Sequence, residues 1–246
     1  MSEKLTMTFP YYENPGMLKY QLDIWNNYPE GWRDKFEVIV VDDGSPKDPA
    51  IQCVSHTLFN FRLYRMTVDV PWNQTSARNL SAYQADKHSW LFLTDIDHVL
   101  DYDNFVKLLK IVQSGELNRK WAYTFARLNG PEKTPYHYHP NSFLMHRSLY
   151  LEVGGYDEEF AGQVYATDGM FRKTLKGVAK NIYHLKNVSI IRFGREHIPD
   201  ASTRTLKRGK EFQAEEVMLR VKERDKIKRT RGEKPRVLSF PWVRQL

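Results

Sequence analysis

The sequence predicts an α/β protein with a mostly parallel sheet flanked by helices, followed by a basic, helical C-terminal extension. Short apolar runs alternate with helical patterns through the first hundred residues, and this alternation is typical of parallel sheets wound right-handed. Two of the runs, residues 38–41 and 90–93, are continuously apolar, as expected of strands buried on both faces. Acidic or turn-forming residues follow both runs, so polar groups should gather at one edge of the sheet.

The first hundred residues supply the predicted strands and helices in strict alternation. Pro10 should end the first strand, because proline has no N–H to donate. Leu18, Leu22 and Trp25 recur at spacings of four and three, which predicts an amphipathic helix. The expected strands are residues 5–9, 36–41, 61–66 and 90–94, and the expected helices are residues 14–25, 49–58 and 75–87.

After residue 103 the patterns are weaker but still define elements. The segment 128–140 is rich in Pro, Gly and His and is expected to be a long loop, and loops of this length are often functional. The other expected elements are helices at 105–113, 166–175 and 206–228, strands at 121–126 and 142–146, and an extended arm at 235–246. We therefore expect one α/β domain over residues 1–200, with halves of about 1–100 and 101–200, and an extension over residues 201–246.

Composition and charge narrow the class of protein. Hydrophobic residues make up 41% of the 246 and charged residues 27%, as is ordinary for a globular protein. No apolar run approaches the roughly 20 residues needed to span a bilayer, the first 16 residues lack an apolar signal core, and Cys53 has no cysteine partner. We expect a cytoplasmic protein.

The excess positive charge lies near the C-terminal end of the sequence. The chain carries a formal net charge of +7. Residues 204–236 contain 13 of the 37 Lys and Arg residues but 6 of the 30 Asp and Glu residues, which accounts for the whole surplus. This stretch is interpreted either as a contact for a polyanion or anionic surface, or as a solvated helix of mixed charge.

Asp95 and Asp97 directly follow the apolar run at 90–93. In a strand, residues i and i+2 point to the same face, so both carboxylates could bind one ion. Carboxylate oxygens suit Mg²⁺ or Mn²⁺, and the carboxyl ends of strands in open α/β sheets are where ligands bind. His98 could be a third ligand, but an adjacent residue points away from that face in a regular strand, which favours a structural role.

Two further groups should lie near the same edge. Asp42 and Asp43 follow the second strand, where a carboxylate can accept hydrogen bonds from a nucleobase or a ribose, or can simply hold a polar turn. Arg78 begins the helix before the Asp-x-Asp strand. Its guanidinium could bind a phosphate or a base carbonyl, or could be an ordinary surface arginine.

Five segments, taken in order, resemble family 2-type glycosyltransferases with the GT-A (Rossmann-like) fold. None is specific alone, but together they extend over about residues 5–175. The last is also similar to the Gly-Gly-Tyr-Asp-Glu segment of galactosyltransferase-like relatives. The segments are Thr-Phe-Pro-Tyr-Tyr at 8–12, Val-Val-Asp-Asp-Gly-Ser at 40–45, Ser-Ala-Arg-Asn at 76–79, Phe-Leu-Thr-Asp-Ile-Asp at 92–97 and Val-Gly-Gly-Tyr-Asp-Glu-Glu-Phe at 153–160.

The resemblance implies a metal-dependent hexosyl- or pentosyltransferase that uses Mn²⁺ or Mg²⁺ and a nucleoside-diphosphate sugar, UDP-sugars foremost. Residues 1–100 would bind the nucleotide sugar and residues 101–200 the acceptor. The residues implied at the donor site are Pro10, Tyr11, Asp42 or Asp43 for the nucleobase and ribose, Arg78 for the nucleotide, and Asp95 with Asp97 for the cation on the diphosphate.

The resemblance also implies a catalytic base shortly after the Gly-Gly-Tyr segment. The family usually has two acids where this chain has Thr167 and Asp168, which leaves Asp168 as the base of an inverting transfer. Met170 replaces a further acid found in many relatives, so the acceptor side departs from the family pattern. Asp168 could instead cap a helix. Related enzymes often recruit a later histidine as a metal ligand, which makes His197 the candidate, although a histidine in a polar loop is the default.

Other functions fit parts of the pattern. A haloacid dehalogenase-like phosphatase also places Asp-x-Asp after an apolar strand, with Asp95 as nucleophile and Asp97 as acid/base. That family uses its first strand and a later acidic cluster, which this chain lacks. A non-catalytic carbohydrate- or nucleic-acid-binding module also fits. The acceptor is open between a glycan or small molecule and a hydroxymethylated DNA base, because the basic stretch suits DNA.

Overall fold

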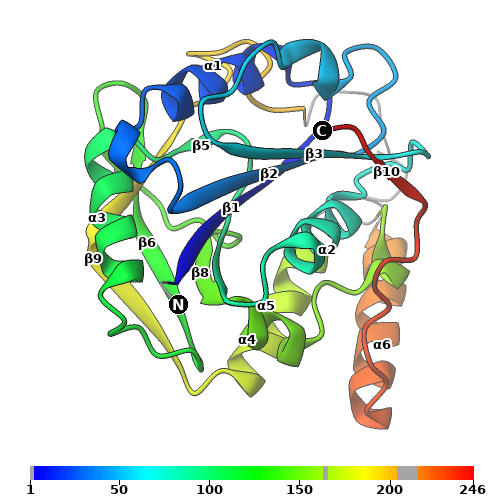
Figure 1. Ribbon diagram of the computed structural model, residues 1–246. Coiled ribbons are helices and arrows are strands. Elements are labelled where there is room, and N and C mark those ends of the chain that lie inside the picture. The colour runs from blue at the N-terminus through cyan, green and yellow to red at the C-terminus, as the bar shows by residue number, and fades with distance from the viewer. Residues whose placement is uncertain (1–2, 163–165, 204–214) are drawn as a thin grey trace.

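The computed structural model describes residues 3–162, 166–203 and 215–246 (Figure 1). One mixed sheet runs through these residues in the order β10-β3-β2-β1-β4-β8-β6-β9-β5, and β7 pairs with β6. Strands β3, β2, β1 and β4 are mutually parallel, and β8 runs antiparallel to β4 and β6. The strands are β1 (Lys4–Tyr11), β2 (Phe36–Asp42), β3 (Asn60–Met66), β4 (Ser89–Leu93), β5 (His98–Val99), β6 (Trp121–Asn129), β7 (Thr134–Tyr136), β8 (Phe143–His146), β9 (Asn181–Arg192) and β10 (Trp242–Arg244).

Helices cover both faces of this sheet, as predicted (Figure 1). Helices α1 and α3 pack on one face through Trp25 and Phe105, and α2, α4 and α5 pack on the other through Leu80, Tyr150 and Phe171. The helices are α1 (Pro15–Asn26), α2 (Gln74–Gln84), α3 (Tyr102–Gln113), α4 (Arg147–Val153), α5 (Ala166–Val178) and α6 (Glu215–Arg231). None of the helices in the described part of the chain is long and apolar enough to cross a membrane.

The apolar run in β2 shows why the parallel strands form the centre. Val38 and Val40 belong to the core beneath α1 and α3, whereas Ile39 and Val41 belong to the core beneath α2, α4 and α5. Successive side chains of a strand point to opposite faces. A continuously apolar strand therefore fills both cores, and the fold class predicted from such runs is confirmed.

Two elements predicted in the first hundred residues differ from the structure. Strand β1 continues through Pro10, which pairs with Val41. Proline is tolerated there because the pairing of β1 with β4 ends at Thr8, leaving the outer end of β1 with one neighbour. The helix expected at 49–58 is only a 3₁₀ turn, Ala50–Cys53, and Asn26 holds the rest of that segment through Leu58 N and His56 O.

The segment expected to be a long loop, 128–140, contains the end of β6 and all of β7, which form a hairpin. Gly130 and Lys133 have positive φ angles of 63° and 52° and turn the chain between the two strands. Strand β9 was not predicted, because five of its twelve residues are exposed and its polar pattern hides the strand period. It pairs in parallel with β6 across a bulge at Phe125.

The basic extension is helical and packs back onto the domain. Residues 204–214 lie outside the described residues, and α6 covers the rest of the predicted helix. Lys228, only 4% exposed, is ion-paired with Asp157 and with Glu159 at 2.9 Å. Arg224 contacts Glu159 at 2.6 Å. These contacts tie α6 to the turn that leads into α5.

Candidate functional site

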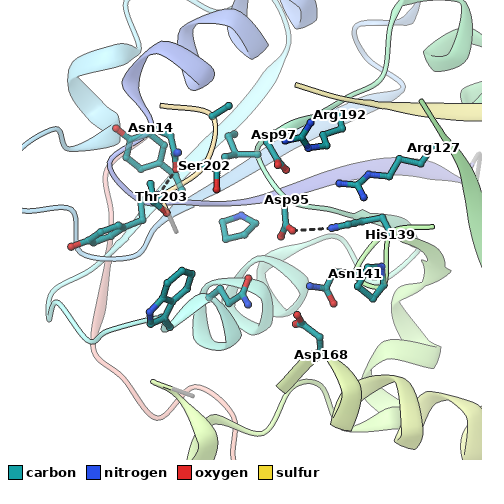
Figure 2. Close-up of a pocket in the computed structure, with 18 of the residues that line it drawn as sticks. Asn14, Asp95, Asp97, Arg127, His139, Asn141, Asp168, Arg192, Ser202 and Thr203 are labelled. Carbon is teal, nitrogen blue, oxygen red and sulfur yellow. Dashed lines mark hydrogen bonds and ion pairs between the residues drawn. The ribbon is translucent and has the colours of Figure 1, made fainter. Parts of the chain in front are cut away.

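A cavity of about 680 Å³ opens at the carboxyl edge of β1, β2 and β4 (Figure 2). Its volume is that of a ligand site, and its place is where open α/β sheets bind ligands. The described residues that line it include Pro10, Tyr11, Tyr12, Asn14, Asp43, Trp72, Asp95, Asp97, Arg127, Tyr136, His137, Tyr138, His139, Asn141, Asp168, Arg172, Arg192, Ser202 and Thr203.

The wall formed by β1 and β2 contains Pro10, Tyr11 and Asp43 but not Asp42. The carboxylate of Asp42 is fully buried and accepts hydrogen bonds from Ser45 N at 2.8 Å and Ala50 N at 2.9 Å. Burial raises the pKa of Asp42, and these two donors act in the opposite direction. Of the two candidate aspartates, Asp42 therefore holds the turn, and Asp43 is the one that faces the cavity.

Asp95 lines the cavity and is held by two side chains, of which Figure 2 shows His139. Its Oδ1 is ion-paired with Arg78, and its Oδ2 lies 3.2 Å from His139 Nε2. Burial opposes the charge on Asp95, but Arg78 followed by His139 keeps the pKa of Asp95 well below its usual range. Asp95 is therefore an anion with fixed orientation.

Arg78 lies behind Asp95 and is not among the residues that line the cavity. It is 1% exposed, and its guanidinium carbon lies 5.6 Å from the ring centre of Tyr156. Burial disfavours its charge, but Asp95 leaves the pKa of Arg78 raised. Arg78 thus serves as a fixed counter-ion to Asp95 rather than as a side chain in the cavity.

Asn79, the next residue of α2, fixes the Gly-Gly-Tyr segment. Its Nδ2 donates to Tyr156 O at 2.8 Å and to Glu158 Oε1 at 2.7 Å, and its Oδ1 accepts from Tyr156 N at 2.9 Å. A Cβ on Gly155, which has a φ of 76°, would lie 2.6 Å from that Oδ1. Glycine is therefore required there by both backbone angle and space.

His139 connects Asp95 to the sheet. Its Nδ1 lies 2.7 Å from Ser142 Oγ, which lies 2.6 Å from Thr94 Oγ1. Burial, followed by the nearby His98, lowers the pKa of His139 to about 4 despite Asp95, so the ring is neutral at pH 7. Since a carboxylate only accepts, Nε2 carries the proton toward Asp95 and Nδ1 accepts from Ser142.

Asp97 and His98 belong to the same group of side chains as Asp95 and His139. Asp97 lines the cavity, and its Oδ1 lies 2.6 Å from Nδ1 of the fully buried His98. The His98 ring packs against His139 with centroids 4.0 Å apart and planes tilted by 31°. Ligand atoms of Asp95, His98 and His139 lie within 4.8 Å of one another. Oxygen and imidazole donors of this kind fit a divalent cation. The cluster includes His98, for which the strand pattern favoured a structural role over a ligand role, and His139, which was not among the expected ligands.

His197 was expected to be a third metal ligand, but the structure places it elsewhere. Its Nε2 lies 3.9 Å from Glu132 Oε2, its Nδ1 lies 3.7 Å from Glu196 Oε1, and its ring packs on Phe193. It lines neither the cavity nor the cluster around Asp95. The geometry does not support a metal role for His197, because its ring is directed to the turn that follows β6.

Asp168 reaches the cavity from the first turn of α5. In Figure 2 its carboxylate points toward Asn141, on the side of the cavity below Asp95 in this view. Thr167 is buried, and Met170 packs against Phe160 and Val221 beneath α6. The position where relatives have another acid is therefore used here to dock the C-terminal helix, and Asp168 is the one carboxylate that α5 brings to the cavity among its described side chains.

The opposite wall carries cations that were not predicted. Arg127, near the end of β6, and Arg192, at the end of β9, both lie against Tyr136, with guanidinium carbons 4.8 Å and 5.4 Å from its ring centre. Arg172 lies 5.1 Å from the ring centre of Tyr138. No sequence motif joins Arg127 to Arg192, which are 65 positions apart, so only the pairing of β6 with β9 reveals the group.

Comparisons with known proteins agree with the fold. Residues 21–129 match the model of the glycosyltransferase-like family 2. Staphylococcus aureus TarS (residues 1–349) has 16% identity over 80% of this chain and 63% of its own, with a TM-score of 0.61. Its complex with UDP-GlcNAc has 16% identity over 89% and 65%, with a TM-score of 0.64.

The mannosyltransferase PcManGT of Pyrobaculum calidifontis, in complex with GDP-Man and Mn²⁺, has 18% identity over 78% of this chain and 57% of its own, with a TM-score of 0.58. This chain thus spans 57–65% of these structures. No curated protein sequence matches it. At these identities the structures show the fold, which is the predicted GT-A type.

Proposed function

We propose that this chain is a metal-dependent glycosyltransferase that moves a sugar from a nucleoside-diphosphate sugar to an acceptor hydroxyl. One observation carries the proposal: a single cavity joins Asp43 on the β2 side, Asp95 and Asp97 after β4, and Asp168 on α5. Carboxylates that bind a nucleoside, neutralise a diphosphate through a cation and accept a proton are the groups that this reaction needs.

The donor would occupy the side of the cavity formed by β1 and β2. Pro10 and Tyr11 would contact the nucleobase, and Asp43 would accept hydrogen bonds from base or ribose. Arg78 would act by holding Asp95 rather than by touching the nucleotide. A UDP-sugar is the first candidate because TarS was solved with UDP and UDP-GlcNAc, although PcManGT was solved with GDP-Man.

Asp95 and Asp97 would hold the divalent cation, Mn²⁺ or Mg²⁺. The fit rests on the donor atoms present: Asp97 faces the cavity, and Asp95 lies within 4.8 Å of two imidazoles. Imidazole near carboxylate favours Mn²⁺ over Mg²⁺, which takes oxygen ligands almost exclusively. When bound, the cation would offset the negative charge on the leaving diphosphate.

Asp168 would be the catalytic base of an inverting transfer. Its carboxylate would take the proton of the acceptor hydroxyl while that oxygen bonds to the anomeric carbon and the bond to the diphosphate breaks. Asn141 lies beside it and would orient either the carboxylate or the hydroxyl (Figure 2). Whether the donor carries a hexosyl or a pentosyl group is a matter for experiment.

The acceptor would enter past Tyr136 and Tyr138, which are 38% and 40% exposed and line the cavity. Aromatic faces suit the ring of a glycan or of a nucleobase, so a glycan, a small molecule and a hydroxymethylated DNA base all fit. The exposed basic residues of α6, which include Lys226 and Arg229, would contact the polyanion if DNA is the acceptor.

Two measurements test these assignments. Release of nucleoside diphosphate from a panel of UDP- and GDP-sugars with Mn²⁺ should identify a donor, and Asp95→Asn should abolish that release. A chain that releases no nucleotide from any donor but hydrolyses phosphate esters, with the hydrolysis lost in Asp95→Asn, would be a phosphatase instead.

For the acceptor, Lys226→Gln with Arg229→Gln should weaken DNA binding and reduce its salt dependence while donor hydrolysis stays unchanged. Lys228 is unsuitable for this test, because it is buried and ion-paired. Lys207 and Arg208 lie outside the described residues. Unchanged DNA binding would leave a glycan or small acceptor.

A further inference from the structure

Arg127 is a buried cation without a carboxylate beside it. It is 9% exposed and lines the cavity. Its Nη1 lies 3.3 Å from His137 Nε2 and 3.4 Å from His137 O, and its Nε has no hydrogen-bond partner among the described residues. No Asp or Glu of the described chain lies within 4.0 Å of its guanidinium.

The other buried cations near the site are compensated. Arg78 is paired with Asp95, and Lys228 with Asp157 and Glu159. The neighbouring Arg192 contacts Glu196 and Asn129, each at 2.6 Å. A buried charge without a counter-ion in contact is costly. Burial lowers the pKa of Arg127, Asp97 opposes this from beyond contact distance, and the repulsion of Arg192, a smaller effect than that of Asp97, adds to the lowering. Such a charge is expected where a ligand supplies the anion.

The sheet places Arg127 away from the nucleotide. Pro10 lies in β1 and Asp43 follows β2, both on one side of β4, whereas Arg127 and Arg192 belong to β6 and β9 on the other side. The carboxylates of Asp95 and Asp97 lie between. Figure 2 shows the same order, with Asn14, Ser202 and Thr203 at one end of the cavity and Arg127 at the other. In the proposed function the second end belongs to the acceptor.

We propose that Arg127, supported by Arg192 and Tyr136, forms a phosphate-binding subsite on the acceptor side of the cavity, so that the acceptor carries a phosphate group near the hydroxyl that receives the sugar. A guanidinium presents paired N–H donors that match a phosphate. The stacking of both guanidiniums on Tyr136 fixes them without neutralising them. The assignment to the acceptor rests on the proposed function, whereas the subsite itself rests on Arg127.

The test uses inorganic phosphate as the probe, because it needs no knowledge of the acceptor. Phosphate is titrated into the protein with Mg²⁺ and saturating UDP, which occupies the donor site, and binding is followed by calorimetry. We expect phosphate to bind the wild type, Arg127→Met to weaken that binding at least tenfold, and Arg127→Lys to weaken it less. Arg220→Met, which removes an exposed arginine of α6, is the matched control and should leave phosphate binding unchanged.

The outcomes separate the sources of the phosphate. If Arg127→Met instead weakens UDP binding tenfold, and UDP displaces phosphate from the wild type, the subsite serves the donor diphosphate. If phosphate and UDP bind Arg127→Met as they bind the wild type, or if the wild type binds no phosphate, the proposal is overturned. A wild type that binds phosphate through Arg127 but binds no nucleotide would refute the proposed function and leave the subsite standing.

A stability measurement excludes a purely structural role. Since Arg127 has no counter-ion to lose, Arg127→Met should melt at the wild-type temperature or above it, as expected where a group is kept for function. A fall in Tm as large as that of Arg78→Met would assign Arg127 to the fold and overturn the proposal.

Discussion

Charged side chains at the two ends of the central strands differ in whether they have an ion-pair partner. At the amino end, Glu37 accepts a hydrogen bond from Thr6 at 2.8 Å and is ion-paired with Arg62 at 2.6 Å, and Glu3 is ion-paired with Arg119 at 2.5 Å. At the carboxyl end, Arg127 is buried without a carboxylate. The charged groups at the amino end are neutralised by ion pairs within the protein. At the cavity, Arg127 has no such partner in the described part of the chain and is available to bind an anionic ligand. Four predictions test this contrast.

The largest effect should come from removing the proposed base at the carboxyl end. Asp168→Asn should lower the transfer rate by about 10²–10⁴-fold, because the acceptor hydroxyl loses its proton acceptor, while UDP affinity stays within about twofold. Initial rates and UDP titration measure the two effects. The control is Asp103→Asn, an exposed aspartate in the first turn of α3. A loss below tenfold would assign the base elsewhere.

Removing Arg78, the cation that is ion-paired with Asp95, should lower the free energy of unfolding. Arg78→Met leaves Asp95 without its counter-ion, and breaking a buried ion pair costs about 3–5 kcal/mol. Urea unfolding of the variant against the wild type measures the change. Arg127→Met provides the comparison and should lose nothing. If the two variants are equally destabilised, the distinction between an ion-paired Arg78 and an unpaired Arg127 is wrong.

Acid should lower the free energy of unfolding through His146, which lies at the amino end of the central strands. This side chain is 3% exposed and accepts from Ser148 N at 3.2 Å, and burial followed by Arg119 lowers the pKa of His146 to about 4. Between pH 6.5 and 4 the unfolded chain binds a proton that the native state does not, so stability falls as the pH falls through this window.

We expect this loss to be about 1–2 kcal/mol, less than the full shift because solvent screens part of it. Unfolding free energies measured at several pH values would show it as a slope. His146→Gln should flatten the slope. A variant with the wild-type slope would mean that another group titrates.

The smallest effect should come from the ion pair at the amino end. Arg62 and Glu37 are 22% and 14% exposed, so a double-mutant cycle with Arg62→Met and Glu37→Gln should give a coupling of about 1 kcal/mol or less. A coupling as large as the loss in Arg78→Met would show that the two ends of the sheet do not differ.

The sequence predicts the β1–β4 side of the cavity better than the other side. Asp95 and Asp97 follow an uninterrupted apolar strand, and that local pattern suffices to place them at the cavity. Asp43 was separated from Asp42 only by the structure, since both follow the same strand and only the hydrogen bonds to Ser45 and Ala50 distinguish them.

The β6–β9 side depends on contacts between distant segments, which have no local signal. Arg127 meets Arg192 only because β9 pairs with β6, and His139 reaches Asp95 only because β7 and β8 fold the chain back. His197 is the opposite case: its residue type suits a metal, but the turn after β9 directs its ring to Glu132. Residue type thus predicts chemistry, whereas topology decides which residues meet.

The short strand β10 protects the protein against self-association. It covers β3 with antiparallel contacts that include Gln245 N to Leu63 O at 2.8 Å and Thr67 N to Pro241 O at 3.0 Å. Without it, the seven-residue β3 would offer a row of unpaired backbone groups to any other strand. The edge strand of the sheet on this side is then β10, which has only three residues, follows Pro241 and contains Arg244. Such a short edge strand, with a neighbouring proline and a charged residue, is a poor template for aggregation.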